Sequence, residues 1–186
     1  MNYFSSDWHL GHNNVIKYSD RPFSSINEMD DRILSNLYSL NPHDSLFFLG
    51  DLAFNQFSLD KFFTLLPKLK INFHWILGNH DQYYKKYYHL CSSISTIKEI
   101  KILGVHTTLC HYPMISWNHS HYNAYQLFGH IHHNSSNPLL LHKISGKMLN
   151  VNIELNNYNL FSELDIHNYM LSQPNNSDYI KGNSHG

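Results

Sequence analysis

The sequence predicts an α/β fold, because short apolar runs typical of buried strands alternate with helix-like segments in its first half. The chain has 186 residues, of which 42% are hydrophobic and 15% are aromatic. A chain of this size and composition can bury a core of its own. We therefore expect one domain over residues 1–171, followed by a loose polar tail rich in Asn and Ser over residues 172–186.

The first strand and the first helix are predicted near the N-terminus. Residues 3–6 are a short β-prone run that leads directly into Asp7-Trp8-His9, so a strand should end there in a polar loop. Residues 25–28 have the spacing of a helix-capping box. Apolar residues then recur every three or four positions as far as Leu40, which predicts an amphipathic helix, and Asn41-Pro42 ends it.

Two more strands and a second helix complete the first half. Residues 45–49 predict a buried strand that ends at Gly50-Asp51. Residues 59–69 fit an amphipathic helix, and residues 71–77 predict a strand that ends at the tetrapeptide GNHD, residues 78–81. The β-α-β-α-β order predicts parallel strands joined by right-handed crossovers.

The second half reads as a series of strands. Residues 94–103 and 105–110 meet near Gly104, which predicts a β-hairpin. Residues 125–128 form a strand-like run that ends at Gly129-His130, and residues 148–155 are the last clear strand.

Composition narrows the classes of function. The chain has 13 basic and 14 acidic residues, a net charge of −1, so strong binding of duplex DNA is not expected. No apolar run approaches the roughly 18 residues of a membrane span, and no secretory leader pattern precedes the first strand. Cys91 and Cys110 are too few for a disulfide scaffold and are expected to be reduced. We therefore expect a cytoplasmic protein that does not bind membranes.

The chain also holds 16 histidines, and several stand with Asp and Asn at the ends of predicted strands. These polar clusters are Asp7-Trp8-His9, Gly50-Asp51, Gly78-Asn79-His80-Asp81, His111 and Gly129-His130-Ile131-His132. In open α/β sheets, ligands bind beyond the carboxyl ends of the strands. Oxygen and nitrogen donors of this kind suit Zn, Mn, Fe or Ni, and the lack of Cys in every cluster argues against a structural zinc or iron–sulfur site. Gly50, Gly78 and Gly129 each precede a candidate ligand, where glycine permits close backbone approach.

The five clusters, in the order D-x-H, GD, GNHD, H and GHxH, resemble the motifs of the calcineurin-like metallophosphoesterase family. The match spans residues 6–132, and the stretch SDWHLGHNNVIKYSDRPF, residues 6–23, further resembles small bacterial and phage phosphoesterases of that superfamily. The resemblance implies a sandwich of two mixed β-sheets flanked by helices, with a centre that holds two divalent metal ions.

The resemblance also implies which residues hold the metals. Those implied for the first metal are Asp7, His9, Asp51 and His132, and those implied for the second are Asp51, Asn79, His111 and His130. Asp51 would bridge the ions, since a carboxylate can span metals about 3.5–4 Å apart that clamp a phosphoryl group. The ions (Mn, Fe, Zn or Ni, with Mn favoured) would turn a bridging water into hydroxide, which would attack phosphorus in line.

Five residues are expected to act on the substrate or beside it. His80 would protonate the leaving oxygen as a general acid. Asp81 would either orient His80 or serve as the carboxylate of a local turn. Asn79 would contact the substrate as well as the metal. His12 would contact the substrate at the rim of the site or lie on the surface, and Arg21 would either grip a phosphate oxygen or form a surface ion pair.

The leading hypothesis from the sequence is a dinuclear-metal-dependent phosphoesterase. Phosphodiesters are the favoured substrates, nucleotide-derived ones among them, and phosphomonoesters are a further option. The aromatic and basic residues of the run 83–88 would suit the stacking of bases, although an amphipathic helix explains the run as well and is favoured. The alternatives are a nuclease for single-stranded or terminal nucleic acid and a non-catalytic scaffold on the same fold. The oligomeric state stays open.

Overall fold

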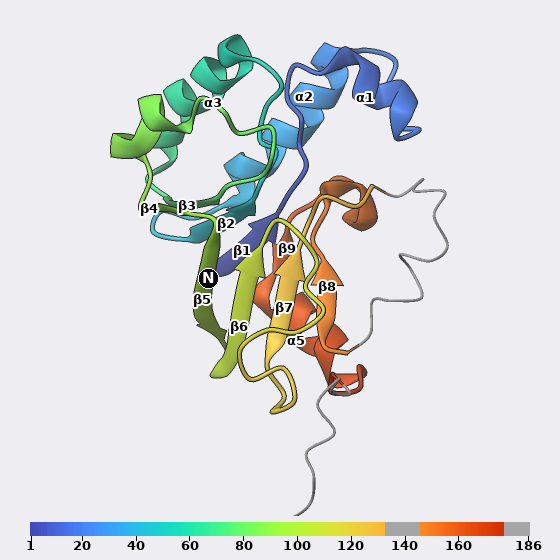
Figure 1. The fold of residues 1–186 in the computed structure, drawn as a ribbon. Coiled ribbons are helices and arrows are strands. Elements are labelled where there is room, and N and C mark those ends of the chain that lie inside the picture. The colour runs from blue at the N-terminus through green and yellow to red at the C-terminus, as the bar shows by residue number, and fades with distance from the viewer. Residues whose placement is uncertain (133–145, 177–186) are drawn as a thin grey trace, which may run out of the picture.

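The computed structural model describes residues 1–132 and 146–176, which form two mixed β-sheets packed against each other with helices outside them (Figure 1). The first sheet has five strands in the order β4-β3-β2-β1-β9, and the second has four in the order β5-β6-β7-β8. This arrangement confirms the α/β fold with two mixed sheets flanked by helices.

The five-stranded sheet contains the parallel strands predicted from the first half of the sequence. Its strands are β1 (Asn2–Ser5), β2 (Ser45–Leu49), β3 (Asn72–Ile76), β4 (Ser93–Ser95) and the antiparallel edge strand β9 (Phe161–Ser162). Both faces of β2 are buried: Leu46 and Phe48 face the core under the helices, while Phe47 and Leu49 face the core shared with the second sheet. This two-sided burial explains why the strand is a continuous apolar run.

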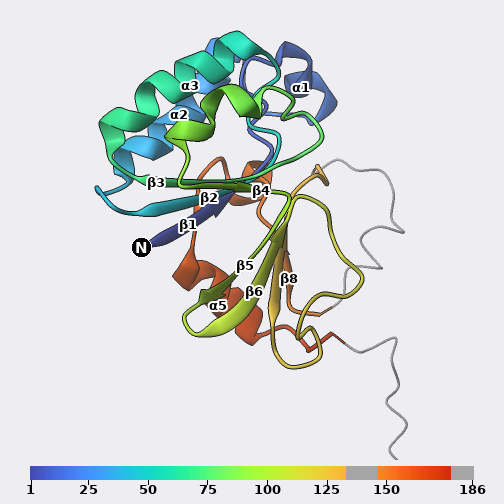
Figure 2. The same cartoon turned by 60° about the vertical axis from the view of Figure 1, so that its left-hand side comes forward.

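Helices α2 (Ile26–Ser35) and α3 (Gln56–Leu69) cover the outer face of the five-stranded sheet (Figure 2), and the short helix α1 (Asn13–Tyr18) lies beside them. The side chain of Ser25 accepts a hydrogen bond from the backbone of Glu28 and so begins α2 at the predicted place. The helix gives way to a 3₁₀ turn, Asn36–Ser39, before the next strand.

The second sheet consists of β5 (Ile97–Ile102), β6 (Val105–Cys110), β7 (Tyr125–Phe128) and β8 (Met148–Asn150). Strands β5 and β6 form the predicted hairpin around Gly104, whose φ is +87°. Strands β6, β7 and β8 run parallel. Helix α5 (Glu163–Leu171) adds Ile166 and Met170 to the core shared by the two sheets.

The structure corrects three of the sequence-based elements. The strand predicted over residues 94–103 divides at Thr96, because β4 pairs with the first sheet and β5 with the second. The strand predicted over residues 148–155 ends at Asn150, and the 3₁₀ helix Ile153–Asn156 follows because the Asn152 side chain accepts a hydrogen bond from the backbone of Glu154. The segment after GNHD is the 3₁₀ helix Tyr84–Leu90 rather than an α-helix.

The start of the predicted tail packs against the domain. Asn176 is buried and donates a hydrogen bond from Nδ2 to the carbonyl of Ile115, at 3.0 Å. The rest of that predicted tail, residues 177–186, lies outside the described residues. Over the two described ranges, no helix combines the length and the apolar character that crossing a membrane requires.

Candidate metal centre

The predicted ligands come together where the ends of parallel strands from both sheets meet. Asp7 and His9 follow β1, and Asp51 follows β2. His111 follows β6 directly, and His130 lies two residues beyond the end of β7. The strand ends thus bring together residues more than 120 positions apart in the chain, as the backbone of His130 donates hydrogen bonds of 3.1 and 3.0 Å to the two carboxylate oxygens of Asp7.

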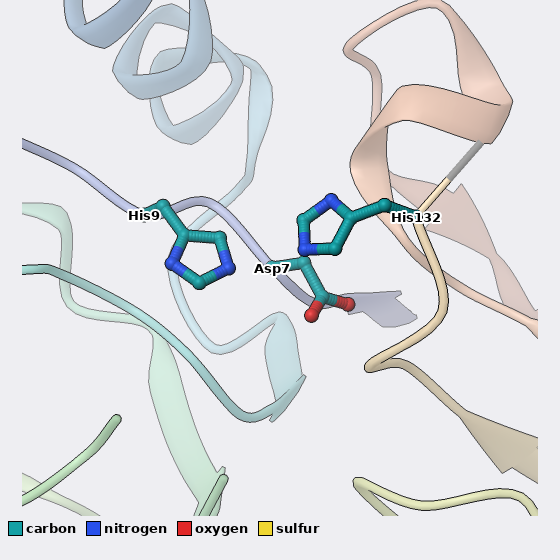
Figure 3. Close-up of side chains that lie close together, drawn as sticks. All are labelled: Asp7, His9 and His132. Atoms are coloured by element: carbon teal, nitrogen blue, oxygen red, sulfur yellow. The ribbon is translucent and has the colours of Figure 1, made fainter. Parts of the chain in front are cut away.

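The acidic and histidine side chains form two groups, each compact enough to hold one cation. The first consists of Asp7, His9 and His132, which surround a common space (Figure 3). The second consists of Asp51, His111 and His130. Within each group, one potential ligand atom per residue lies within 4.8 Å of the others. Each group contains three of the four residues implied by the resemblance, which also assigned Asp51 to the first set and Asn79 to the second.

Asp51 lies between the two groups. Its Oδ2 atom is 3.7 Å from Nε2 of His9 and 3.5 Å from Nε2 of His111. Asn79 joins the second group, because its Oδ1 atom is 3.2 Å from the same Nε2 of His111. Nitrogen and oxygen atoms of Asp51, His9, His111 and Asn79 therefore lie close together between the two groups.

Hydrogen bonds on the far sides of two imidazole rings orient them. His111 donates from Nδ1 to the carbonyl of Leu49 at 2.7 Å, and His132 Nδ1 lies 2.8 Å from Oε1 of Glu154. In both rings Nε2 is thereby left for a ligand, the arrangement found in metal-binding histidines. The ring of His9 is buried, and neither of its nitrogens has a hydrogen-bond partner among the described residues. A buried unpaired nitrogen is costly unless a ligand satisfies it, so the residues fit a cation.

The backbone is strained at four of the candidate ligands. Asp7, His9, Asp51 and His130 all have left-handed φ angles, of 57°, 50°, 61° and 69°. Such conformations in residues other than glycine cost on the order of 1–3 kcal/mol and cluster at functional sites. Backbone hydrogen bonds hold the first two loops in place, since Asp7 donates to Gly50 and His9 donates to Asp51.

The motif glycines leave room for the ligands. A Cβ atom on Gly78 would overlap Oδ1 of Asp51, and one on Gly129 would overlap the carboxylate of Asp7. A Cβ on Gly50 would overlap the ring of His111, and this glycine also has a φ of +92°. The close approach expected for these positions is therefore present at all three.

Burial and charge bias the protonation of the centre. Burial raises the pKa of Asp7 to about 6 and lowers the pKa of His9 to about 3, so His9 is a neutral imidazole. Burial acts to raise the pKa of Asp51, but the hydrogen bond and charge of His111 outweigh it and lower this pKa. Burial likewise acts to lower the pKa of His111, yet the hydrogen bond to Asp51 raises it. The centre therefore favours positive charge beside Asp51.

Asn79 and His80 stand at the exposed mouth of the centre. The backbone of His80 donates to Oδ1 of Asp51 at 2.9 Å, and its ring centroid is 5.5 Å from that of His9. His12 also lies at this rim, where its ring stacks on Phe54 at 4.0 Å. Asn79, His80 and His12, which were predicted to face a substrate, therefore all lie beside the two ligand groups.

The prediction that Asp81 orients His80 is wrong. The Asp81 carboxylate is buried and accepts hydrogen bonds from the backbone of Asp51, Leu52 and Gly78 and from the indole of Trp75. Three of these donors bind Oδ2 and the backbone of Leu52 binds Oδ1, and among the described residues the carboxylate makes no hydrogen bond to the ring of His80. Asp81 instead ties the loops after β2 and β3 together, as the alternative of a turn carboxylate requires.

Both predictions for Arg21 are also wrong. Its guanidinium is buried, forms an ion pair of 2.8 Å with Glu154, and donates to the carbonyls of Asp7 and Trp8. It therefore neither faces a substrate nor forms a surface ion pair. Its planar guanidinium stabilises the loop after β1 by donating hydrogen bonds to two of that loop's carbonyls.

Glu154 is a residue of the site that the sequence reasoning missed. It links Arg21 to His132 and so connects the first loop with the segment after β7. Glu154 was missed because the strand predicted over residues 148–155 included it, whereas the observed strand β8 ends at Asn150. The signal was available in the polar residues Asn152 and Glu154, which follow a parallel strand just as the other site residues do.

The protein thus combines a fold of two mixed β-sheets with two neighbouring groups of Asp and His side chains, and the carboxylate of Asp51 in the second group lies 3.7 Å from His9 in the first. No protein-family model matches the chain. The chain is 31% identical over 157 residues to the uncharacterized protein MJ1445 of Methanocaldococcus jannaschii, a match that covers 84% of this chain and 83% of that protein. The chain belongs to the same family as MJ1445.

A solved structure shows the same fold. The crystal structure of AQ665 from Aquifex aeolicus, a protein of unknown function, matches with a TM-score of 0.73 and 26% sequence identity. The match covers 91% of this chain and 98% of that chain. The fold therefore extends over nearly the whole length of both proteins.

Proposed function

We propose that this protein is a metal-dependent phosphoesterase of the calcineurin-like type, which hydrolyses phosphodiester bonds at a centre of two divalent cations. The observation that carries the proposal is the position of Asp51, whose Oδ2 atom lies 3.7 Å from His9 and 3.5 Å from His111. One carboxylate shared by two ligand groups is the arrangement that two-metal hydrolases use to hold their ions together.

The donor set supports two ions of the first transition row. Asp7, His9 and His132 would hold one ion. The second group (Asp51, His111 and His130) would hold the other together with Asn79. Oxygen and imidazole donors without any thiolate suit Mn, Fe, Zn or Ni, and we propose Mn. When bound, the two ions would supply the charge that activates water and neutralises the phosphoryl oxygens.

The side chains at the mouth perform the remaining steps. His80 is exposed beside the first group and would give a proton to the leaving oxygen, a task that suits an imidazole near neutral pH. Its backbone bond to Asp51 holds it next to the shared carboxylate. Asn79 would bind a phosphoryl oxygen from the other side, and His12 would contact the substrate at the rim.

Metal content and hydrolysis together test the proposal. The purified protein, loaded with Mn²⁺, should bind two ions and hydrolyse bis(p-nitrophenyl) phosphate faster than the corresponding monoester. Asp51→Asn and His111→Ala should lose metal and hydrolysis together. His80→Ala should keep both ions and lose about 10²- to 10⁴-fold in kcat, the range for a general acid. His89→Ala, at an exposed histidine far along the 3₁₀ helix, is the matched control.

Two outcomes would reject the proposal. A protein that binds no divalent cation would contradict the metal centre. A protein that binds two cations but hydrolyses neither substrate, nor an oligonucleotide in the same assay, would support the scaffold alternative instead.

A further inference from the structure

A cavity of about 450 Å³ opens beside the second ligand group. Its lining residues are Leu77, Gly78, Asn79, Asp81, Gln82, Tyr84, Thr96, Ile97, Cys110 and Tyr112. It shares Asn79 with the candidate metal centre, because Oδ1 of this residue is 3.2 Å from Nε2 of His111. A group in the cavity can therefore be covalently attached to a phosphate held at the centre.

The walls of the cavity suit an uncharged, flat group. Neither Lys nor Arg is among the lining residues, so a phosphate would find no cationic partner there. Asp81 is the lining residue with an ionisable carboxylate, and its oxygens are taken by four donors and are buried. Leu77, Ile97 and Cys110 supply apolar surface, while Gln82 and Thr96 offer polar atoms for hydrogen bonds.

Tyr112 forms the boundary between the cavity and the centre. Its hydroxyl donates to Oδ1 of Asn79 at 3.4 Å, and its ring centroid is 4.8 Å from that of His130. The residue is 44% exposed, so one part of its ring is open to a ligand. Tyr84 lines the same cavity from the 3₁₀ helix Tyr84–Leu90. Aromatic rings beside a phosphate site are a common means of binding bases by stacking.

We infer that this cavity binds the nucleobase of a nucleotide-derived substrate whose phosphate lies at the metal centre. The inference rests on the proposed function for the phosphate, and the cavity supplies the substrate class. The net charge of −1 fits a single nucleotide unit better than a long polynucleotide, which would need a row of cationic contacts. Tyr84 and Tyr112 are the specificity-determining residues in this arrangement.

Binding of two ligands that differ only in the base tests the inference. Adenosine 5′-monophosphate and ribose 5-phosphate share the phosphate and the sugar, and their affinities can be compared by calorimetry with Mn²⁺ present. The His80→Ala background slows turnover during the titration. We expect the nucleotide to bind about tenfold tighter than the sugar phosphate, in keeping with stacking on an aromatic ring.

Substitutions in the cavity test whether the preference for the nucleotide over the sugar phosphate arises there. Tyr84→Ala and Tyr112→Ala should each bring the two affinities closer together, and Ile97→Trp should do the same by filling the cavity. Tyr88→Ala changes an exposed tyrosine of the same 3₁₀ helix that does not line the cavity, so it should keep the full preference. Circular dichroism of each variant checks its fold, and Ile97→Trp keeps the test informative where a tyrosine variant does not fold.

The outcomes separate this inference from the proposed function. Equal affinities for the two ligands in the His80→Ala protein with an unaltered cavity would overturn the inference, even where the wild type hydrolyses bis(p-nitrophenyl) phosphate. A base preference that survives all three cavity variants would overturn it as well. A preference that the variants abolish, in a protein that hydrolyses no phosphoester, would support the base site and reject the proposed activity.

Discussion

Glu154 shows how a single buried side chain can act on the candidate centre without belonging to it. Its Oε1 atom lies 2.8 Å from Nδ1 of His132 and 2.8 Å from Nη2 of Arg21, so one carboxylate oxygen serves both side chains. A carboxylate partner fixes the tautomer of a ligand histidine and raises its basicity. Glu154 is therefore a positioning residue for the first ligand group.

Replacing Glu154 with Gln should weaken metal binding while the fold persists. Glutamine keeps an acceptor oxygen for Arg21 but loses the charge that supports His132. We expect Mn²⁺ affinity to fall by about 10- to 100-fold, the usual effect of removing such a partner. Calorimetric titration of metal-free protein measures it, with Glu99→Gln as an exposed control. Unchanged affinity in the Glu154 variant would show that His132 does not depend on this partner.

Gly78 gives a second prediction at the residue scale. Alanine at this position would bring a Cβ onto Oδ1 of Asp51 and close to its backbone nitrogen, so it should displace the shared carboxylate. Gly78→Ala should therefore lower both metal affinity and stability. Gly104→Ala is the matched control, because its Cβ meets nothing within 4 Å although its φ is +87°. That control should cost stability alone, and equal metal affinities in the two variants would count against the close packing at Gly78.

At the scale of elements, Asp30 joins helix α2 to the loop that precedes α1. Its carboxylate accepts from the backbone of Gly11 at 3.2 and 3.1 Å, two residues beyond His9. Burial raises the pKa of Asp30 from 3.8 to about 6. The folded state therefore prefers the protonated carboxyl more strongly than the unfolded chain does.

The pH dependence of stability should report the burial of the Asp30 carboxyl, which outweighs the opposite effect of the hydrogen bond from Gly11 on its pKa. The contribution of Asp30 to stability is fully present below pH 4 and is lost as the pH rises through about 6. Asp30→Asn does not titrate, so the variant should gain stability relative to the wild type as the pH rises from 4 to 6.5. Urea unfolding at several pH values measures the difference. Parallel profiles for the two proteins would mean that Asp30 has an ordinary pKa in the folded state.

The elements themselves differ in how far local sequence predicts them. Strand β2 was predictable because burial on both faces leaves a continuous apolar run, and α2 was predictable from its periodicity and its cap at Ser25. Strand β9 has only two residues, and it pairs with β1 from the opposite end of the chain. So short a strand carries no periodicity, and its existence depends on a partner that is remote in sequence.

At the scale of the whole molecule, the proposed metals should contribute to stability. The centre holds strained backbone at four candidate ligands and the buried ring of His9, whose nitrogens have no hydrogen-bond partner among the described residues. A cation that binds only the folded state at 100 times its Kd adds about 2.7 kcal/mol. For a chain of this length, that corresponds to a rise in Tm of roughly 5–10 °C.

Thermal unfolding with and without a chelator tests this prediction. Mn²⁺ should raise the Tm of the wild type in a concentration-dependent way, and the chelator should reverse the rise. Asp51→Asn should unfold at nearly the same temperature in both conditions. An equal rise in the wild type and in this variant would point to cation binding away from the centre.

The sequence by itself determined the parallel β-α-β-α-β half, and its motifs singled out the seven candidate ligands that lie at the candidate centre, namely Asp7, His9, Asp51, Asn79, His111, His130 and His132. Polar motifs at predicted strand ends could be recognised because ligands in open α/β sheets bind beyond the carboxyl ends of the strands, whereas the packing of the two sheets brings the ends of β1, β2 and β3 to those of β6 and β7. Tertiary structure decided the division of residues 94–103 between two sheets, and the roles of Asp81, Arg21 and Glu154. Those roles depend on hydrogen bonds and ion pairs between residues that are distant in the chain. Such contacts leave no local pattern, and they exist only once the two sheets have packed together.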